Sequence, residues 1–171
     1  MNADAAKVLA DYFAGLMENE SAITAKVLAA VPDSGRDYRP DPKSRTAWEL
    51  ATHLATSDIW FLDSIINGSF HFDPDTEKKM TGTFASIADV VAFYKREFPD
   101  RVGKLRALPS DKLTEAVDFF GMMKNANVTY LGLANNHSIH HRGQLASYLR
   151  AMGSKVPSIY GGSADEPFQA P

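Results

Sequence analysis

The sequence contains no cysteine, which excludes disulfide bonds, thiol nucleophiles, cysteine-bound zinc and iron–sulfur clusters within this chain. It also lacks any apolar run near the roughly 18 residues that a membrane-spanning helix needs. No block of basic residues is present, and 18 Lys and Arg against 21 Asp and Glu give a net charge of −3. We therefore predict a protein whose partners include neither membranes nor nucleic acid.

The N-terminal ten residues carry Lys7 in their middle and no long apolar segment. A secretory signal is therefore not expected, and a cytoplasmic location is predicted. The 171 residues suit a single domain, 1–171. A chain of this size buries roughly 70% of the surface that its unfolded form exposes, so it can fold without disulfides.

Hydrophobic residues recur every three to four positions in four segments, which predicts an all-α fold. Thr46-Ala47-Trp48-Glu49 is typical of a capping box at a helix start, and Asn67-Gly68 is typical of a helix end. Ser86 gives a weaker start signal, and Pro99 is expected to kink or split the helix that follows. The predicted helices cover residues 4–30, 46–67, 86–108 and 127–152.

The segments between these helices are less regular. Residues 69–83 read as a long connection over one end of the domain, and residues 111–124 are ambiguous, with a short extended arm ending at Gly121 as one interpretation. Residues 155–171 contain three prolines and predict an irregular C-terminal tail. Four long amphipathic helices predict a four-helix bundle. The first two connections, of roughly 15 and 18 residues, exceed the usual 2–8, which favours at least one crossover.

Three of the five histidines lie in the last predicted helix, within the segment Asn135 to Gln144. His137 and His141 are four residues apart, so a helix places both side chains on one face, roughly 5–6 Å apart at Cβ. Zincins use this spacing for two zinc ligands, but Ser138 stands where their motif has its glutamate base. His140 points elsewhere, toward another helix or solvent. The alternative interpretation of the pair is that both are surface or capping histidines.

A metal site needs a third ligand, and His53 in the second predicted helix is the candidate. It borders the apolar stripe of that helix, so two facing helices can bring it against His137 and His141. Three imidazoles would leave a coordination position open, as catalytic sites do. Zn²⁺ and Ni²⁺ both accept imidazole, so the residues do not choose between them. Alternatively, His53 is a buried, hydrogen-bonded histidine; His71, in a loop, is interpreted as structural or solvated.

The C-terminal motif resembles that of a known family. The segment His137-x-x-x-His141-Arg142-Gly143-Gln144-Leu145 is followed by Tyr148-Leu149-Arg150, Gly153 and Val156-Pro157-x-x-Tyr160-Gly161. It is similar to the last helix and C-terminal continuation of DinB-like (YfiT-type) proteins, which are named for induction by DNA damage. His53 stands where that family has its first metal ligand, and the resemblance covers essentially the whole chain.

The resemblance implies an up-down-down-up four-helix bundle, often dimeric, with nickel or zinc held by His53, His137 and His141. Family members of known activity are thiol-dependent transferases that use bacillithiol or mycothiol, so a low-molecular-weight thiol and a small electrophile are the implied substrates. Beside the ligands, Gly143 is expected to permit close helix approach, and Gln144 to hydrogen-bond a neighbour. Arg142 is expected to pair with a carboxylate on another helix or, alternatively, to hold an anionic substrate group.

The leading hypothesis is a metal-dependent enzyme with S-transferase-like chemistry on a small electrophilic molecule. A metal-dependent hydrolase is nearly as compatible with the residues, and a non-catalytic metal-binding stress-response module is the alternative outside enzymes. A helical bundle without metal is the remaining possibility. No general acid or base is assigned, because spacing does not place Glu49, Asp58 or Tyr130 at the site.

Overall fold

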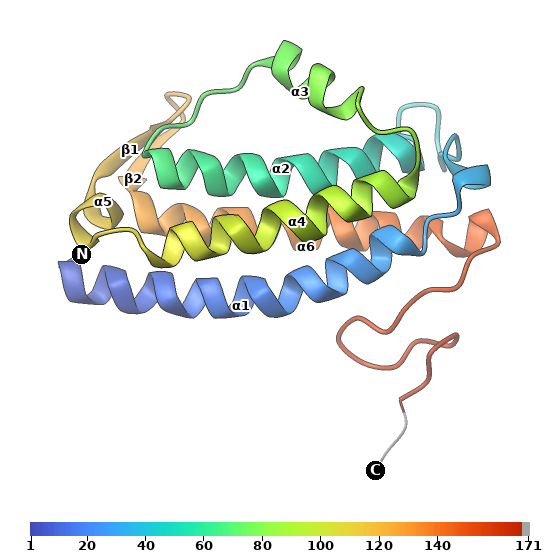
Figure 1. The fold of residues 1–171 in the computed structure, drawn as a ribbon. Coiled ribbons are helices and arrows are strands. Elements are labelled where there is room, and N and C mark those ends of the chain that lie inside the picture. The colour runs from blue at the N-terminus through green and yellow to red at the C-terminus, as the bar shows by residue number, and fades with distance from the viewer. Residues whose placement is uncertain (169–171) are drawn as a thin grey trace.

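In the computed structural model, which describes residues 1–168, four long helices pack side by side as a bundle (Figure 1). Helices α1 and α2 each pack against both α4 and α6, which places α1 opposite α2 across one hydrophobic core. The bundle helices are α1 (Ala3–Ala29), α2 (Ala47–Asn67), α4 (Ile87–Arg106) and α6 (Tyr130–Tyr148). The all-α prediction is confirmed, with only a two-stranded hairpin added.

Contacts at the two ends of the bundle fix the helix directions. Ser154, beyond α6, donates a hydrogen bond of 2.6 Å to the Ala30 carbonyl at the end of α1, so these two helices end together. At the other end, Lys7 in α1 donates to the carbonyl of Arg106, the last residue of α4. Asn127, just before α6, donates to the Ile65 carbonyl near the end of α2. Helices α1 and α6 therefore run one way and α2 and α4 the other, as the colours in Figure 1 also show.

The helix starts follow from their capping residues. Thr46 and Glu49 form the predicted capping box of α2, because each side chain accepts a hydrogen bond from the other residue's backbone N–H. Ser86 and Asp89 form a second box at α4. Gly68 ends α2 with φ of 68°, a left-handed conformation that glycine adopts without steric cost.

Two helices differ in detail from the prediction. Helix α4 is continuous through Pro99, so the expected split is wrong. The exposed position of Pro99 explains this, since its missing N–H and the freed carbonyl one turn earlier face solvent. The last predicted helix, 127–152, consists of α6 with a 3₁₀ turn at each end, Asn127–Thr129 and Arg150–Met152.

The connections contain more regular structure than the sequence predicted. Residues 69–83 include a helix, α3 (Pro74–Thr81), which lies along α2 rather than over one end of the bundle (Figure 1). Asp73 caps it and Pro74 occupies its first turn, a favourable start that the apolar pattern could not reveal because α3 has no buried residue. A further 3₁₀ turn, Asp33–Gly35, lies between α1 and α2.

The ambiguous stretch before α6 forms a short helix, α5 (Ser110–Thr114), and a hairpin of β1 (Ala116–Phe119) and β2 (Met123–Ala126). The extended interpretation was correct for β1, and the turn includes Gly121 as expected. Phe120 and Gly121 both have positive φ, the conformation that tight hairpin turns require. The tail after Gly153 has no helix or strand through residue 168; the predicted irregular residues 169–171 lie outside the described part. Within residues 1–168, the helices fall short of the combined length and apolarity that a membrane crossing requires.

Candidate metal centre

Three histidines from two helices meet on one side of the bundle. His53 lies on α2, and His137 and His141 lie one turn apart on α6. One ligand nitrogen of each lies within 4.8 Å of the other two. The ring centroid of His53 lies 5.3 Å from that of His137 and 4.7 Å from that of His141. The ring centroids of His137 and His141 are 4.4 Å apart. The structure thus brings together the three residues that the sequence singled out.

Local sequence and helix packing account for this arrangement. The i,i+4 spacing puts His137 and His141 on one face of α6, and that face meets α2. Small buried residues of α2, Ala51 and Ala55, lie two positions on either side of His53. All three histidines are partly buried, which leaves the site reachable from solvent.

The environment keeps the three imidazoles neutral at pH 7. Burial, with smaller effects of Arg45 and the neighbouring histidines, lowers the pKa of His53 to about 3. Burial and the nearby histidines lower the pKa of His137 to about 4. Burial also lowers the pKa of His141, against an opposing hydrogen bond to Gln144. Neutral imidazole is the form that binds a metal ion, so the protonation states favour coordination.

The three Nδ1 atoms of the cluster have different environments. His141 Nδ1 lies 2.8 Å from Gln144 Oε1. Since an amide oxygen only accepts, Nδ1 carries the proton and Nε2 keeps its lone pair for a ligand. His53 Nδ1 lies 3.7 Å from Glu77 Oε1 on α3. His137 Nδ1 is buried and has no hydrogen-bond partner among residues 1–168.

These features fit a divalent cation. Three neutral imidazoles with a lone pair to spare suit zinc or nickel, and an unpartnered buried nitrogen is costly unless a ligand satisfies it. Glu77 is the nearest acidic group to the cluster's His53 ring, and the candidate group in the described part of the chain contains the three histidines alone. The set therefore leaves coordination positions for a small molecule.

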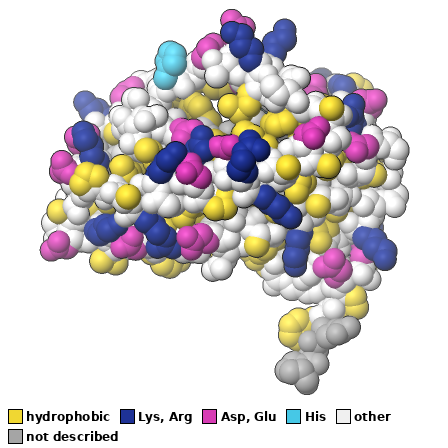
Figure 2. All heavy atoms as spheres, viewed as in Figure 1, with side chains coloured by type: hydrophobic (Ala, Val, Ile, Leu, Met, Phe, Trp, Pro, Cys, Tyr) yellow, Lys and Arg dark blue, Asp and Glu magenta, His cyan; other side chains and the backbone are white. Residues whose placement is uncertain are grey.

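A cavity of about 570 Å³ opens beside the cluster, between α2 on one side and α3 with the preceding loop on the other. His53 and His137 form part of its wall. Figure 2 shows hydrophobic side chains gathered beneath α3, above the band of charged residues along α4. The volume is in the range of small-molecule sites, so the histidines lie at a cavity that can hold a ligand.

The other histidines stay outside the cluster. His140 is exposed, as expected, although its ring centroid lies 4.9 Å from that of His141. His71 is also exposed, and its backbone carbonyl accepts a hydrogen bond of 2.8 Å from Trp60 Nε1. His71 is also one of the residues that line the cavity, a position that the sequence did not predict.

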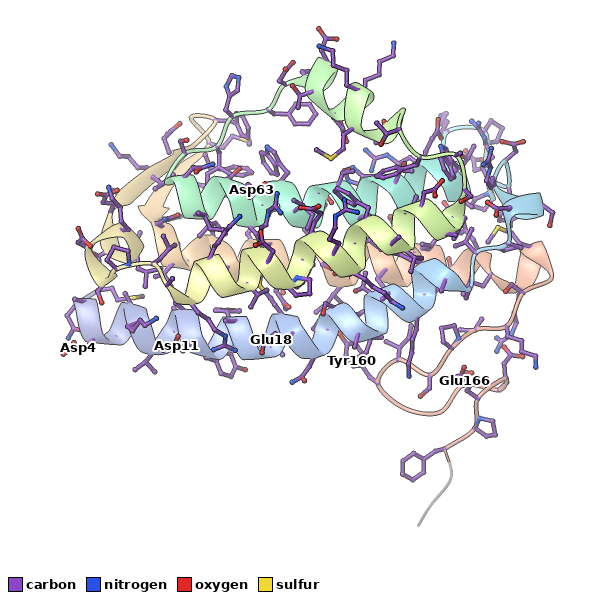
Figure 3. All side chains as sticks on the ribbon, viewed as in Figure 1. Asp4, Asp11, Glu18, Asp63, Tyr160 and Glu166 are labelled. Carbon is purple, nitrogen blue, oxygen red and sulfur yellow. The ribbon has the colours of Figure 1, made fainter. Side chains whose placement is uncertain are left out.

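Of the three residues beside the ligands, two behave as predicted. Arg142 is 1% exposed and pairs with Glu20 on α1 at 2.6 Å, the structural alternative for this residue. The hydroxyl of Tyr160, in the tail beneath α1 (Figure 3), also donates a hydrogen bond to the Glu20 carboxylate. Gln144 contacts a candidate ligand, as expected. The expectation for Gly143 was wrong, because it is exposed and a Cβ there would meet nothing within 4 Å.

Glu49, Asp58 and Tyr130, to which the sequence assigned no acid–base role, do not line the cavity. Glu49 caps α2, and Tyr130 is buried with its hydroxyl donating to the Val117 carbonyl. Asp58 is buried between helices and accepts hydrogen bonds from Tyr94 on α4 and Ser138 on α6. Burial raises the pKa of Asp58 to about 7. Sequence reasoning missed Glu77, since nothing in a polar, exposed segment indicates that it will lie beside a buried histidine.

The fold and the site together define a class of protein: four-helix bundles with a three-histidine cluster open to a side cavity. Comparison with known sequences gives the family. Residues 4–169 match the DinB family, and the chain belongs to it.

Two relatives match most of this chain in sequence. It is 29% identical over 142 residues to the Bacillus subtilis protein YjoA, covering 81% of this chain and 87% of YjoA. It is 28% identical to YrdA of the same organism, covering 91% and 90% of the two chains. Both relatives are named only as uncharacterized proteins, so the names bring no activity.

Two crystal structures of DinB-like proteins resemble this one. The B. subtilis YjoA structure superposes with a TM-score of 0.68 at 25% identity, covering 86% of this chain and 96% of YjoA. A DinB-like protein from Bacillus cereus gives a TM-score of 0.71 at 26% identity, with 86% and 95% covered. The mostly helical fold is thus shared by solved members of the family.

Proposed function

We propose that this protein is a divalent-metal-dependent enzyme that transfers a low-molecular-weight thiol to a small electrophile. The observation that carries the proposal is a cluster of three neutral histidines, two of which, His53 and His137, line a cavity of about 570 Å³. A structural metal site is closed by protein ligands, whereas this one faces space that a reactant can fill.

His53, His137 and His141 would hold nickel or zinc. When bound, such a cation supplies Lewis acidity, which lowers the pKa of a thiol or water molecule at its open position. Gln144 keeps His141 in the tautomer whose Nε2 faces the ligand, through its contact with Nδ1. The aromatic wall of the cavity excludes water from the electrophile and positions it for attack.

The absence of cysteine is compatible with this chemistry, because the nucleophilic sulfur belongs to the cosubstrate. In the reaction, the thiolate sulfur forms a bond to an electrophilic carbon of the acceptor. The leaving group departs with the electron pair of the bond that breaks, and the proton of the thiol goes to solvent. No side chain is required to change oxidation state.

The first experiment tests the metal. Elemental analysis of the purified protein is expected to find close to one nickel or zinc ion per chain. A His137→Ala, His141→Ala double variant is expected to lose it, whereas His140→Ala, which alters a neighbouring exposed histidine, should retain it. Equal metal content in all three proteins would refute the site.

The second experiment tests the reaction. The metal-loaded protein is assayed with 1-chloro-2,4-dinitrobenzene and with bacillithiol, mycothiol or glutathione, following thioether formation and chloride release. A thiol-dependent rate that the double variant lacks supports transfer. Failure with every thiol, together with cleavage of ester substrates, would favour the metal-dependent hydrolase. Failure of both assays in a protein that contains metal would favour a non-catalytic, metal-binding stress-response module.

A further inference from the structure

The cavity beside the histidines has an unusually aromatic wall. Trp60 and Phe61 on α2, Phe72 in the loop before α3, and Phe119 on the hairpin all line it. Trp60 also contacts the ring of Phe120 in a stacked geometry, with ring centroids 6.3 Å apart. Aromatic rings favour flat, apolar partners through burial and stacking, so the shape and chemistry of the wall favour a ligand with an aromatic or planar apolar body.

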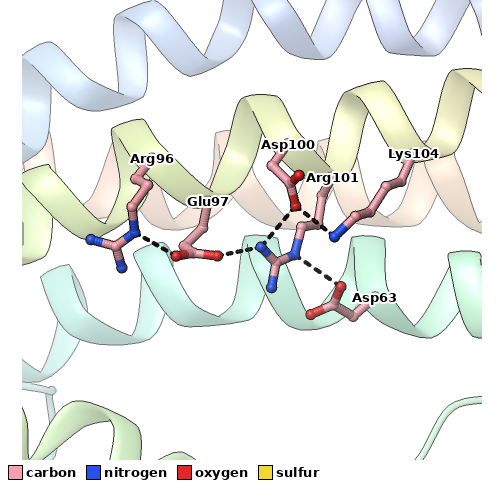
Figure 4. A network of polar contacts seen from close by, with 6 residues as sticks. All are labelled: Asp63, Arg96, Glu97, Asp100, Arg101 and Lys104. Atoms are coloured by element: carbon pink, nitrogen blue, oxygen red, sulfur yellow. Dashed lines mark hydrogen bonds and ion pairs between the residues drawn. The ribbon is translucent and has the colours of Figure 1, made fainter.

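The charged groups in the wall are all acidic: Asp63, Asp73 and Glu77. Two of them are already engaged. Asp63 pairs with Arg101 at 3.1 Å, within the network that also holds Glu97, Asp100 and Lys104 on α4 (Figure 4). Asp73 caps the start of α3 through the backbone of Asp75.

Glu77 is therefore the acidic group that a ligand in this cavity would meet. Its side chain is 34% exposed, it lies on the cavity side of α3, and its nearest ionisable neighbour is the His53 ring at 3.7 Å. No lysine or arginine is part of the wall among the described residues. A carboxylate on the ligand would meet like charge beside Glu77, whereas a neutral or cationic group would not.

Positive charge also acts on the histidines. Arg45 precedes α2 and is close enough to the three histidines to lower the pKa of each, but it does not line the cavity. Arg45 therefore opposes the effect of Glu77 at the histidines, whereas no cationic side chain does so along the described part of the cavity wall toward Trp60.

We propose that this cavity binds the planar apolar body of an uncharged or cationic small molecule, and that Glu77 makes the site reject acceptors carrying a carboxylate. This rests on the proposed function, because it names the substrate class for the same site. In this proposal Glu77 is a specificity-determining residue, and α3 forms the part of the cavity wall that discriminates between ligands.

The test uses three naphthalene probes that differ in charge: 2-naphthalenemethanol, 2-naphthylmethylamine and 2-naphthoate. Binding is measured by calorimetry on the full-length protein, both as purified and after EDTA treatment, at low salt. In the EDTA-treated protein, where no cation offsets the charge of Glu77, the alcohol and the amine are expected to bind on the order of tenfold more tightly than the carboxylate. Glu77→Gln should reduce that difference several-fold, because it removes the like charge and keeps the shape.

A matched pair of variants on α3 tests whether the ligand binds in this cavity. Met80→Glu replaces an apolar part of the cavity wall with a carboxylate that the ligand would have to desolvate, and it should weaken binding of the alcohol about tenfold, whereas Thr81→Glu adds the same charge outside the wall and should not. Because α3 has no buried residue, neither variant is expected to unfold the bundle. Equal binding of carboxylate and alcohol, equal effects of the two variants, or no binding of any probe would overturn the proposal.

The metal-free arm separates the two proposals. If the EDTA-treated protein binds the alcohol with the expected charge preference while the purified protein contains no metal, the proposed function fails and the ligand preference stands. If metal is present and none of the probes binds either form, the ligand preference fails alone.

Discussion

At the residue scale, Gln144 contacts one of the three clustered histidines and is expected to affect metal binding by them. It is exposed, and its amide oxygen lies 2.8 Å from Nδ1 of His141. That contact selects the His141 tautomer and fixes the orientation of the ring. We expect Gln144→Ala to weaken zinc binding about 10- to 100-fold, the usual effect of losing such a partner.

Competition with a chromophoric chelator measures this affinity. Ser147→Ala is the control, since Ser147 is exposed on the same helix and donates only to the Gln144 carbonyl. Gln144→Glu, which retains an acceptor, should keep most of the affinity. Unchanged zinc binding in Gln144→Ala would show that the contact does not orient the ligand.

Asp58 is expected to contribute a loss of stability as pH rises. Its folded-state pKa is raised from an ordinary value of 3.8 to about 7 by burial, although Ser138 and Tyr94 donate to its Oδ2. The folded state therefore binds a proton more tightly than the unfolded state. Stability from this group is full below pH 4 and is lost as pH rises toward 7.

We expect Asp58→Asn to remove this loss, because an amide keeps the acceptor but carries no charge. Relative to wild type, the variant should gain on the order of 4 kcal/mol of unfolding free energy between pH 4 and pH 8. Urea denaturation of the metal-free proteins at several pH values measures it. Taking the difference between the two proteins removes the opposite pH dependence of the histidines, and a difference that does not vary with pH would contradict the assignment.

At the scale of elements, helix α2 carries His53, so its first turn bears on both stability and the site. Thr46 accepts from the Glu49 backbone at 3.1 Å, and Glu49 accepts from the Thr46 backbone at 2.7 Å. Thr46→Ala should cost about 1 kcal/mol of unfolding free energy. Denaturation beside an exposed control, Ser147→Ala, measures this, and equal stability of the two variants would argue against a role for the box.

The elements show where sequence patterns succeed. Helices α1, α2, α4 and α6 bury an apolar face, so periodicity predicts them, and capping residues give the starts of α2 and α4. Helix α3 buries nothing, and the β1–β2 hairpin has strands of four residues, too short for an alternating pattern to be distinctive. The predicted break at Pro99 rests on the local helix-breaking tendency of proline. Burial of Tyr94, Phe98 and Val102, on both sides of Pro99, stabilises α4 as one continuous helix.

At the scale of the molecule, a metal that binds only the folded state stabilises it. At a free metal concentration 100 times the dissociation constant, the gain is about 2.7 kcal/mol. EDTA should therefore lower the melting temperature of the metal-loaded wild type, and restored zinc should raise it again. The His137→Ala, His141→Ala variant should show neither change; calorimetry with and without chelator measures both, and an unresponsive wild type would contradict a tight site.

The dimer implied by the family resemblance remains a prediction for this chain. Sedimentation equilibrium measures the mass in solution, and a two-chain species is expected.

The sequence alone determined the helical class, most helix boundaries and the face shared by His137 and His141, because these depend on spacing within a few turns. The apolar stripe of the second predicted helix made His53 the candidate third ligand, and the family resemblance pointed to the same residue. Only the tertiary structure decided that Glu77 lies beside His53, that Arg142 pairs with Glu20, and that an aromatic cavity adjoins the histidines. These contacts join residues far apart in the chain, and nothing in the local pattern of either partner specifies the distance between them.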